Sequence, residues 1–152
     1  MLLDGVHHVA ILSSDTDRLV AFYRHVFGAT VEHASVDGPV RLTFVSIGPN
    51  TELNIFEIDG NHEAEHQTPM FGRGRLDHIG LRAASMEAFG ELRRRLIEVG
   101  ASDGFVTDFG PVLSLFFTDP DGLEGEVCVP NPDARPGVRH PPGTAAAQFD
   151  AP

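Results

Sequence analysis

Two histidines occupy matching places in two short apolar segments of this 152-residue chain. His8 lies within residues 5–11, and His78 lies within residues 76–81, seventy positions later. In both segments polar and apolar residues alternate, which is the period-two pattern of a half-buried strand. Since imidazole nitrogens are common metal ligands, the repeat predicts two such ligands on matching faces of two matching strands.

The same alternation in the last expected strand places a carboxylate on the face that we expect to carry the two histidines. Alternation over residues 123–129 places Val127 and Val129 on the helix-facing side and Glu126 on the opposite side. Two imidazoles and one carboxylate suit Fe(II), Mn, Ni, Co or Zn and leave coordination positions open for a substrate. A lone strand histidine is more often a packed residue than a ligand, but the repeat symmetry favours the metal site.

A second carboxylate depends on the register of an earlier strand, residues 51–57. With Leu53 and Ile55 on the helix side, Glu52 faces the same side as the histidines. A slip of one residue would replace Glu52 by Glu57 on that side, because successive side chains point to opposite faces. The sequence leaves both registers open.

The elements that must position these residues occur twice in the order strand, helix, strand, strand, strand. The first helix is expected to begin near the capping residues 13–17 and to end at Gly28, and the second to begin after Ser85 and to end at Gly100. The apolar stripes expected on the two helices are Leu19, Phe22, Tyr23 and Val26, and Phe89, Leu92, Leu96 and Val99. The strands expected after the helices are 30–34, 40–47 and 52–58, and then 105–107, 112–118 and 123–129.

The chain therefore divides into a first module over 1–58, a linker over 59–74 and a second module over 75–130. Residues 131–152 are rich in Pro, Ala and Gly, and we expect this tail to be disordered or laid over a partner.

Composition excludes several partners. The net charge is −11 and all eleven cations are Arg, which argues against nucleic acid and anionic membranes as partners. A single cysteine, Cys128, cannot form an internal disulfide, and no apolar run approaches the roughly 20 residues of a membrane helix. We expect a cytoplasmic protein that acts on a small molecule. Arg82 shares the face of His78, where it either pairs with an anionic substrate or forms a salt bridge at the rim.

At this point the chain resembles a known family, the vicinal oxygen chelate superfamily, over about residues 5–130. It includes glyoxalase I, methylmalonyl-CoA epimerase, extradiol dioxygenases, and fosfomycin and bleomycin resistance proteins. The segments that carry the resemblance are 6–11, 22–23, 27–28, 77–81, 117–122 and 126–127.

The resemblance implies an α+β fold in which two βαβββ modules form a cupped mixed sheet with the helices on its convex side. It also implies a divalent metal ion (Ni, Co, Zn, Mn or Fe) on the concave face and a homodimer. His8, His78 and Glu126 match the metal ligands of the family, and Glu52 matches a fourth ligand of the glyoxalase I type.

We therefore expect a metal-dependent lyase or isomerase of the glyoxalase I or epimerase type, with Glu126 and Glu52 as candidate catalytic bases. The metal would stabilise an enediolate or enolate of a small oxygenated substrate. One alternative is an Fe(II) extradiol-type dioxygenase, although the only tyrosine, Tyr23, falls on the buried stripe of the first helix. The other is a metal-free protein that binds a drug or metabolite.

Overall fold

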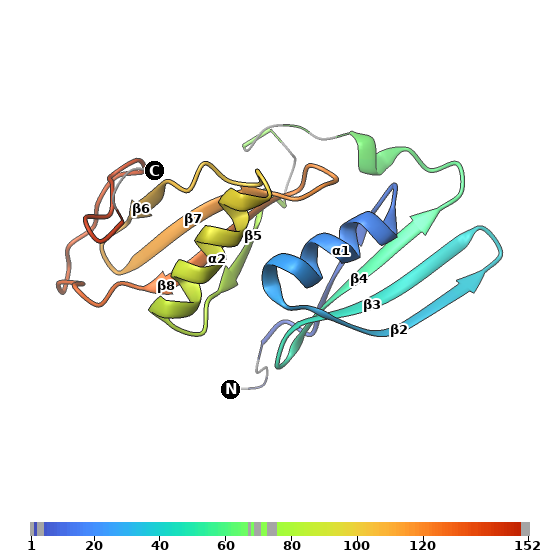
Figure 1. Cartoon of the computed structure of the whole chain (residues 1–152), viewed down its shortest axis with the longest axis horizontal. Coiled ribbons are helices and arrows are strands. Elements are labelled where there is room, and N and C mark those ends of the chain that lie inside the picture. The colour runs from blue at the N-terminus through green and yellow to red at the C-terminus, as the bar shows by residue number, and fades with distance from the viewer. Residues whose placement is uncertain (1, 3–4, 67, 69–70, 73–75, 150–152) are drawn as a thin grey trace. The chain divides into compact units, whose positions relative to one another are not determined.

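A computed structural model of the chain describes residues 2, 5–66, 68, 71–72 and 76–149. The chain separates into two compact units, one of Met1–Gln67 with Pro120–Gly122 and the other of Thr68–Asp119 with Leu123–Pro152. In the described residues each unit carries one α-helix and one four-stranded sheet (Figure 1). The linker expected over 59–74 lies outside the described residues at 67, 69–70 and 73–74.

The first unit follows the expected order of one strand, one helix and three strands. Its sheet has the order β1-β4-β3-β2, with β1 parallel to β4 and the other neighbours antiparallel. The elements are β1 (His8–Leu12), α1 (Thr16–Phe27), β2 (Thr30–Asp37), β3 (Val40–Gly48), β4 (Thr51–Ile58) and the short 3₁₀ helix η1 (Glu63–Glu65).

Helix α1 begins and ends as its sequence predicts. The Asp15 side chain accepts a hydrogen bond from the backbone N–H of Arg18 at 3.0 Å, and Gly28 ends the helix with a φ of 69°. The fully buried Leu19 packs with Leu53 and Ile55 of β4 in the core between helix and sheet. This packing assigns one face of the sheet to the helix and leaves the other face for the predicted site.

The second unit repeats the plan. Its sheet has the order β5-β8-β7-β6, again with one parallel pair, β5 with β8. The elements are β5 (Ile79–Arg82), α2 (Met86–Glu98), β6 (Val106–Asp108), β7 (Val112–Thr118) and β8 (Glu124–Pro130). The two-module α+β class predicted from the sequence is confirmed.

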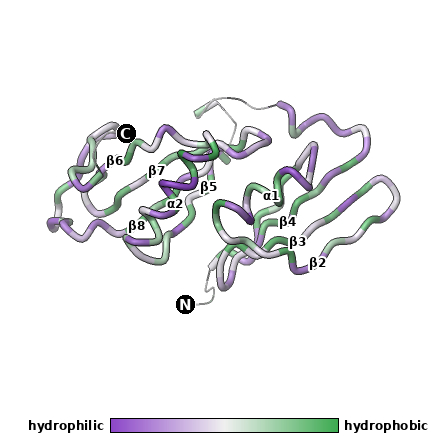
Figure 2. Tube along the Cα trace, in the orientation of Figure 1, coloured by the Kyte–Doolittle hydropathy of each residue, from purple (hydrophilic) through white to green (hydrophobic). Residues whose placement is uncertain are grey.

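Both helices carry apolar and polar residues in turn along their length (Figure 2). In α2, which Ser85 caps through a hydrogen bond from Ala88 N, Phe89 and Leu96 are fully buried. Val99 was expected in the same stripe but is 41% exposed, because the helix ends at Glu98 and Val99 is its C-cap. Within the part of the chain that the structure describes, neither α-helix is long and apolar enough to cross a membrane.

The C-terminal segment differs from the disordered tail that its composition predicts. In residues 131–149, the backbone oxygen of Thr144 accepts from Asp108 N at 2.8 Å, and Ala146 N donates to Val106 O at 3.0 Å. The Phe149 ring packs edge-on against Phe89, with centroids 5.4 Å apart. The segment therefore extends the β6 edge of its own sheet; residues 150–152 lie outside the described residues.

Candidate metal centre

The second unit brings two of the predicted ligands together. His78 immediately precedes β5, and Glu126 lies on β8, the parallel neighbour of β5. The His78 Nε2 atom is 3.4 Å from Glu126 Oε2, and the two side chains are 30% and 15% exposed. His78 Nδ1 lies 2.9 Å from Asp77 Oδ2, so this carboxylate contacts one ring nitrogen and leaves the other, Nε2, on the side of Glu126.

Glu126 is held in turn by a fully buried hydroxyl. Ser114 Oγ, on β7, donates a hydrogen bond to Glu126 Oε1, which leaves Oε2 on the side of His78. Sequence reasoning missed both Ser114 and Asp77 as orienting groups. The available signals were the polarity of Ser114 within the otherwise apolar run 112–117 and the position of Asp77 next to the histidine.

The spacing of the two ligand atoms fits a shared divalent ion. Nitrogen and oxygen ligands about 2.1 Å from a metal lie roughly 3 to 3.5 Å from each other, depending on the coordination angle. The 3.4 Å between His78 Nε2 and Glu126 Oε2 falls in that interval. An imidazole contacted by a carboxylate and a carboxylate contacted by a hydroxyl are the kinds of donor and outer partner that metal sites use.

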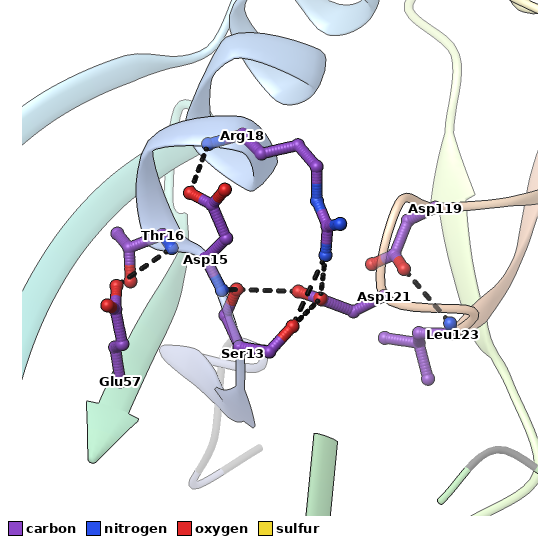
Figure 3. Close-up of polar contacts among 9 residues, drawn as sticks. Ser13, Asp15, Thr16, Arg18, Glu57, Asp119, Asp121 and Leu123 are labelled. Atoms are coloured by element: carbon purple, nitrogen blue, oxygen red, sulfur yellow. Dashed lines mark hydrogen bonds and ion pairs between the residues drawn. The ribbon is translucent and has the colours of Figure 1, made fainter. Parts of the chain in front are cut away.

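The first unit resolves the register of Glu52. In the parallel pair of β1 with β4, His8 is the register partner of Glu52. Leu53 is 1% exposed in the core, which places Glu52 on the opposite face, with His8. Glu57 lies on the helix side, where its Oε2 accepts a hydrogen bond from Thr16 N at 2.9 Å (Figure 3). The register with Glu52 on the histidine face is the one observed.

His7 also belongs to this region, although its sequence context did not distinguish it from a surface residue. Its Nδ1 lies 3.0 Å from His8 Nδ1, so the contact engages Nδ1 of His8 and leaves Nε2 available. His7 and Glu52 line one pocket of about 640 Å³. Its other lining residues are Gly5, Val6, Ser46, Gly48, Pro49, Asn50 and Thr51.

The predicted ligands thus form two pairs, each described within its own unit. His78 and Glu126 are in contact in the second unit, and His8 and Glu52 are neighbours across two strands of the first. No group of three or more His, Cys, Asp or Glu side chains that could hold a metal occurs among residues 2, 5–66, 68, 71–72 and 76–149.

Cys128 lies on the same face as Glu126, two residues further along β8. Burial, and then the negative charge of Glu126, raise the pKa of the Cys128 thiol to about 12. The thiol is therefore neutral near pH 7, as expected for a small packed residue rather than a nucleophile.

The two aspartates of the Asp119-Pro120-Asp121-Gly122 turn have structural roles (Figure 3). Asp119 Oδ1 accepts from Leu123 N at 2.9 Å and closes the turn. Asp121, which groups with the first unit, accepts from Ser13 Oγ and from Arg18 Nη2, both at 2.6 Å. Because the Asp121 carboxylate is buried and occupied by these donors, it stabilises the region where α1 begins.

The sequence model of one protein family, the Glyoxalase/Bleomycin resistance protein/Dioxygenase superfamily, matches residues 5–127. The chain belongs to this superfamily. No protein of curated function matches the chain in sequence.

Solved structures share the fold. A glyoxylase/bleomycin resistance protein/dioxygenase domain from Frankia sp. EAN1pec is 22% identical, with a TM-score of 0.71, covering 85% of this chain and 99% of that one. The fosfomycin resistance protein FosX from Listeria monocytogenes, in complex with Mn(II) and sulfate, is 20% identical, with a TM-score of 0.64, covering 88% and 98%. The protein SMU.1112c is 28% identical, with a TM-score of 0.62, covering 83% and 98%.

Proposed function

We propose that this chain is a metal-dependent lyase or isomerase of the glyoxalase I or epimerase type, which transfers a proton next to a carbonyl group. The observation that carries the proposal is the contact of His78 with Glu126, in which each ligand is oriented by a buried or half-buried neighbour. His8 would be the third ligand and Glu52 the fourth. Ni, Co, Zn, Mn and Fe all suit this donor set, and FosX is known with Mn(II).

The residues of the chain divide the work of such a reaction. A bound divalent ion would supply a Lewis acid that stabilises negative charge developing on a substrate oxygen. Asp77 would hold the ring of His78 with Nε2 directed at the ion, and Ser114 would hold the Glu126 carboxylate. Glu126, or else Glu52, would remove the proton from the substrate carbon; it would return the proton to the adjacent carbon in a glyoxalase-type reaction or to the same carbon in an epimerisation.

The two ligand pairs come from different units, so a complete site needs both. The units can belong to one chain or to two chains of a homodimer. Mixing His8→Ala protein with His78→Ala protein distinguishes these arrangements. Metal binding recovered in the mixture is expected for a site shared by two chains, because some dimers then contain one intact site; no recovery is expected for a site within one chain.

Metal analysis of protein purified without an affinity tag tests the proposal. We expect close to one divalent ion per chain in the wild type and loss of that ion in His78→Ala. His62→Ala is the matched control, since its side chain is 70% exposed and pairs with Glu65. Wild-type protein that is isolated without metal and takes up no Ni, Co, Zn or Mn would refute the proposal.

The competing functions give different results in the same set of experiments. Oxygen consumption with catechol-like substrates under Fe(II) would indicate a dioxygenase. The buried Tyr23, 3% exposed and stacked on Phe27, argues against this activity because its hydroxyl belongs to the core of the first unit. Unchanged metal content and unchanged ligand affinity in His78→Ala would instead indicate a metal-free binding protein.

A further inference from the structure

Arg82 lies on the same sheet face as the metal ligands of the second unit. In the parallel pair of β5 with β8, Gly80 is the partner of Glu126, and Arg82 is the partner of Cys128. These pairs are successive on one face, and two residues of strand span about 7 Å. The backbone of Arg82 therefore lies about 7 Å further along the same face than the position paired with Glu126.

The side chain of Arg82 is exposed and forms no ion pair with any carboxylate of the described residues. Three other arginines are neutralised: Arg18 by Asp121, Arg41 by Asp17, and Arg94 by Glu91. The rim salt bridge that the sequence left open for Arg82 is thus not formed within that part of the chain. An uncompensated cation beside a site is a candidate for binding a ligand anion.

A pocket of about 380 Å³ lies against Arg82, entirely within the second unit. It is lined by Gly80, Leu81, Arg82, Val112, Cys128, Val129 and Pro130. Arg82 is the one acidic or basic residue of this lining. The walls are otherwise apolar, as in most small-molecule sites with one orienting polar group.

Gly80 connects this pocket to the metal ligands. A Cβ at Gly80 would lie 3.6 Å from Glu126 Oε2. Because glycine has no side chain, the space between the pocket and this carboxylate is open at Gly80. A molecule in the pocket can therefore extend over Gly80 to the ligand atoms of Glu126 and His78.

We propose that Arg82 is a specificity residue that binds a carboxylate or another anionic group of the substrate, while an apolar part of the substrate occupies the pocket. This inference rests on the proposed function for the placing of the reacting atoms at the metal. It assigns the substrate to the class of organic anions with an aromatic or branched aliphatic group.

Calorimetric titration of the full chain loaded with Mn(II) tests this assignment with 3-phenylpropionate and its neutral analogue, 3-phenylpropionamide. The wild type should bind the carboxylate at least tenfold more tightly than the amide. Arg82→Gln should abolish this preference, and Arg82→Lys should keep part of it. Arg24→Gln, which removes an exposed cation from α1, should bind as the wild type does.

An equal preference in the wild type and Arg82→Gln would overturn the assignment, and so would a wild type that binds neither probe or both probes equally. Metal content is measured in every variant and should not change with Arg82. A chelated sample separates the two proposals: carboxylate binding that still depends on Arg82, in a protein that takes up no metal, would support the pocket and refute the metal-dependent function.

Discussion

At the scale of single residues, the side chains that touch the proposed ligands are as informative as the ligands. Asp77 fixes which nitrogen of His78 faces the site, and Ser114 fixes which oxygen of Glu126 does so. Groups of this kind orient metal ligands and raise their affinity without touching the ion.

We predict that Asp77→Asn and Ser114→Ala each weaken metal binding by about 10- to 100-fold, because the ligand atoms lose their fixed orientation. Competition with a metallochromic chelator measures this affinity. Ser102→Ala is a control for Ser114→Ala, since Ser102 also donates to an acceptor of the same unit, the backbone oxygen of Phe116. An affinity unchanged in both test variants would show that the two contacts do not orient metal ligands.

The sequence predicts His78 and Glu126 on one face because the apolar neighbours of each residue, on its own strand, mark the side of the sheet that faces the helix. It does not predict the contact of Ser114 with Glu126. That contact depends on the pairing of β7 with β8, in which Ser114 is opposite Cys128 and Phe116 is opposite Glu126, and side-chain alternation along one strand does not fix the alignment of two strands.

At the scale of elements, the register of β4 decides the roles of two glutamates. Glu52 shares a face with His8, whereas Glu57 accepts a hydrogen bond from the first residue of α1. The fully buried Ile55 between them ties this register to the core, since a one-residue slip would expose it. The strand itself was predictable, but its register was not, because both faces of residues 51–57 carry a glutamate.

The variants Glu52→Ala and Glu57→Ala form a matched pair. Glu57→Ala should lower the free energy of unfolding by about 1 kcal/mol, since the N–H of Thr16 at the helix N-terminus loses its acceptor, and should leave metal affinity unchanged. Glu52→Ala should weaken metal binding or catalysis and change stability by less than about 0.5 kcal/mol. Urea unfolding and metal titration measure the two effects, and the reverse pattern would contradict the register.

On α2, hydrogen bonds from Arg94 and Arg95 lower the pKa of Glu91 to about 2, from an ordinary value of 4.5. Since the folded-state pKa is the lower one, the stabilisation is present above about pH 4.5 and is lost as the pH falls toward 2. The Glu91 side chain is exposed, so the effect should be small and should weaken in high salt.

We predict that Glu91→Gln unfolds at a lower temperature than the wild type at pH 7 and that the difference shrinks between pH 4.5 and pH 2. Thermal melts followed by circular dichroism measure it. Asp37→Asn, at the end of β2, removes the same charge from an element without this arginine pair and should show a smaller difference. A Glu91→Gln difference that stays constant down to pH 2 would contradict the assignment.

At the scale of the whole molecule, the duplicated order of elements was enough to predict two α+β units with one helix and four strands each. The C-terminal segment is attached through few contacts, such as the bridge of Ala145 to Thr107 and the ring contact of Phe149 with Phe89, and composition does not predict them. The composition of residues 131–152 shows a low apolar content, but it does not predict that the one aromatic residue, Phe149, packs against Phe89.

The proposed metal site depends most on one relation between the units: His8 and His78 must bind the same ion. Pulsed electron paramagnetic resonance of protein loaded with Cu(II) counts the histidine nitrogens bound to the metal. We predict two imidazoles in the wild type and one in each of His8→Ala and His78→Ala. A wild-type count of one imidazole that persists in His8→Ala would contradict the account, because the metal would then be held by the second unit alone.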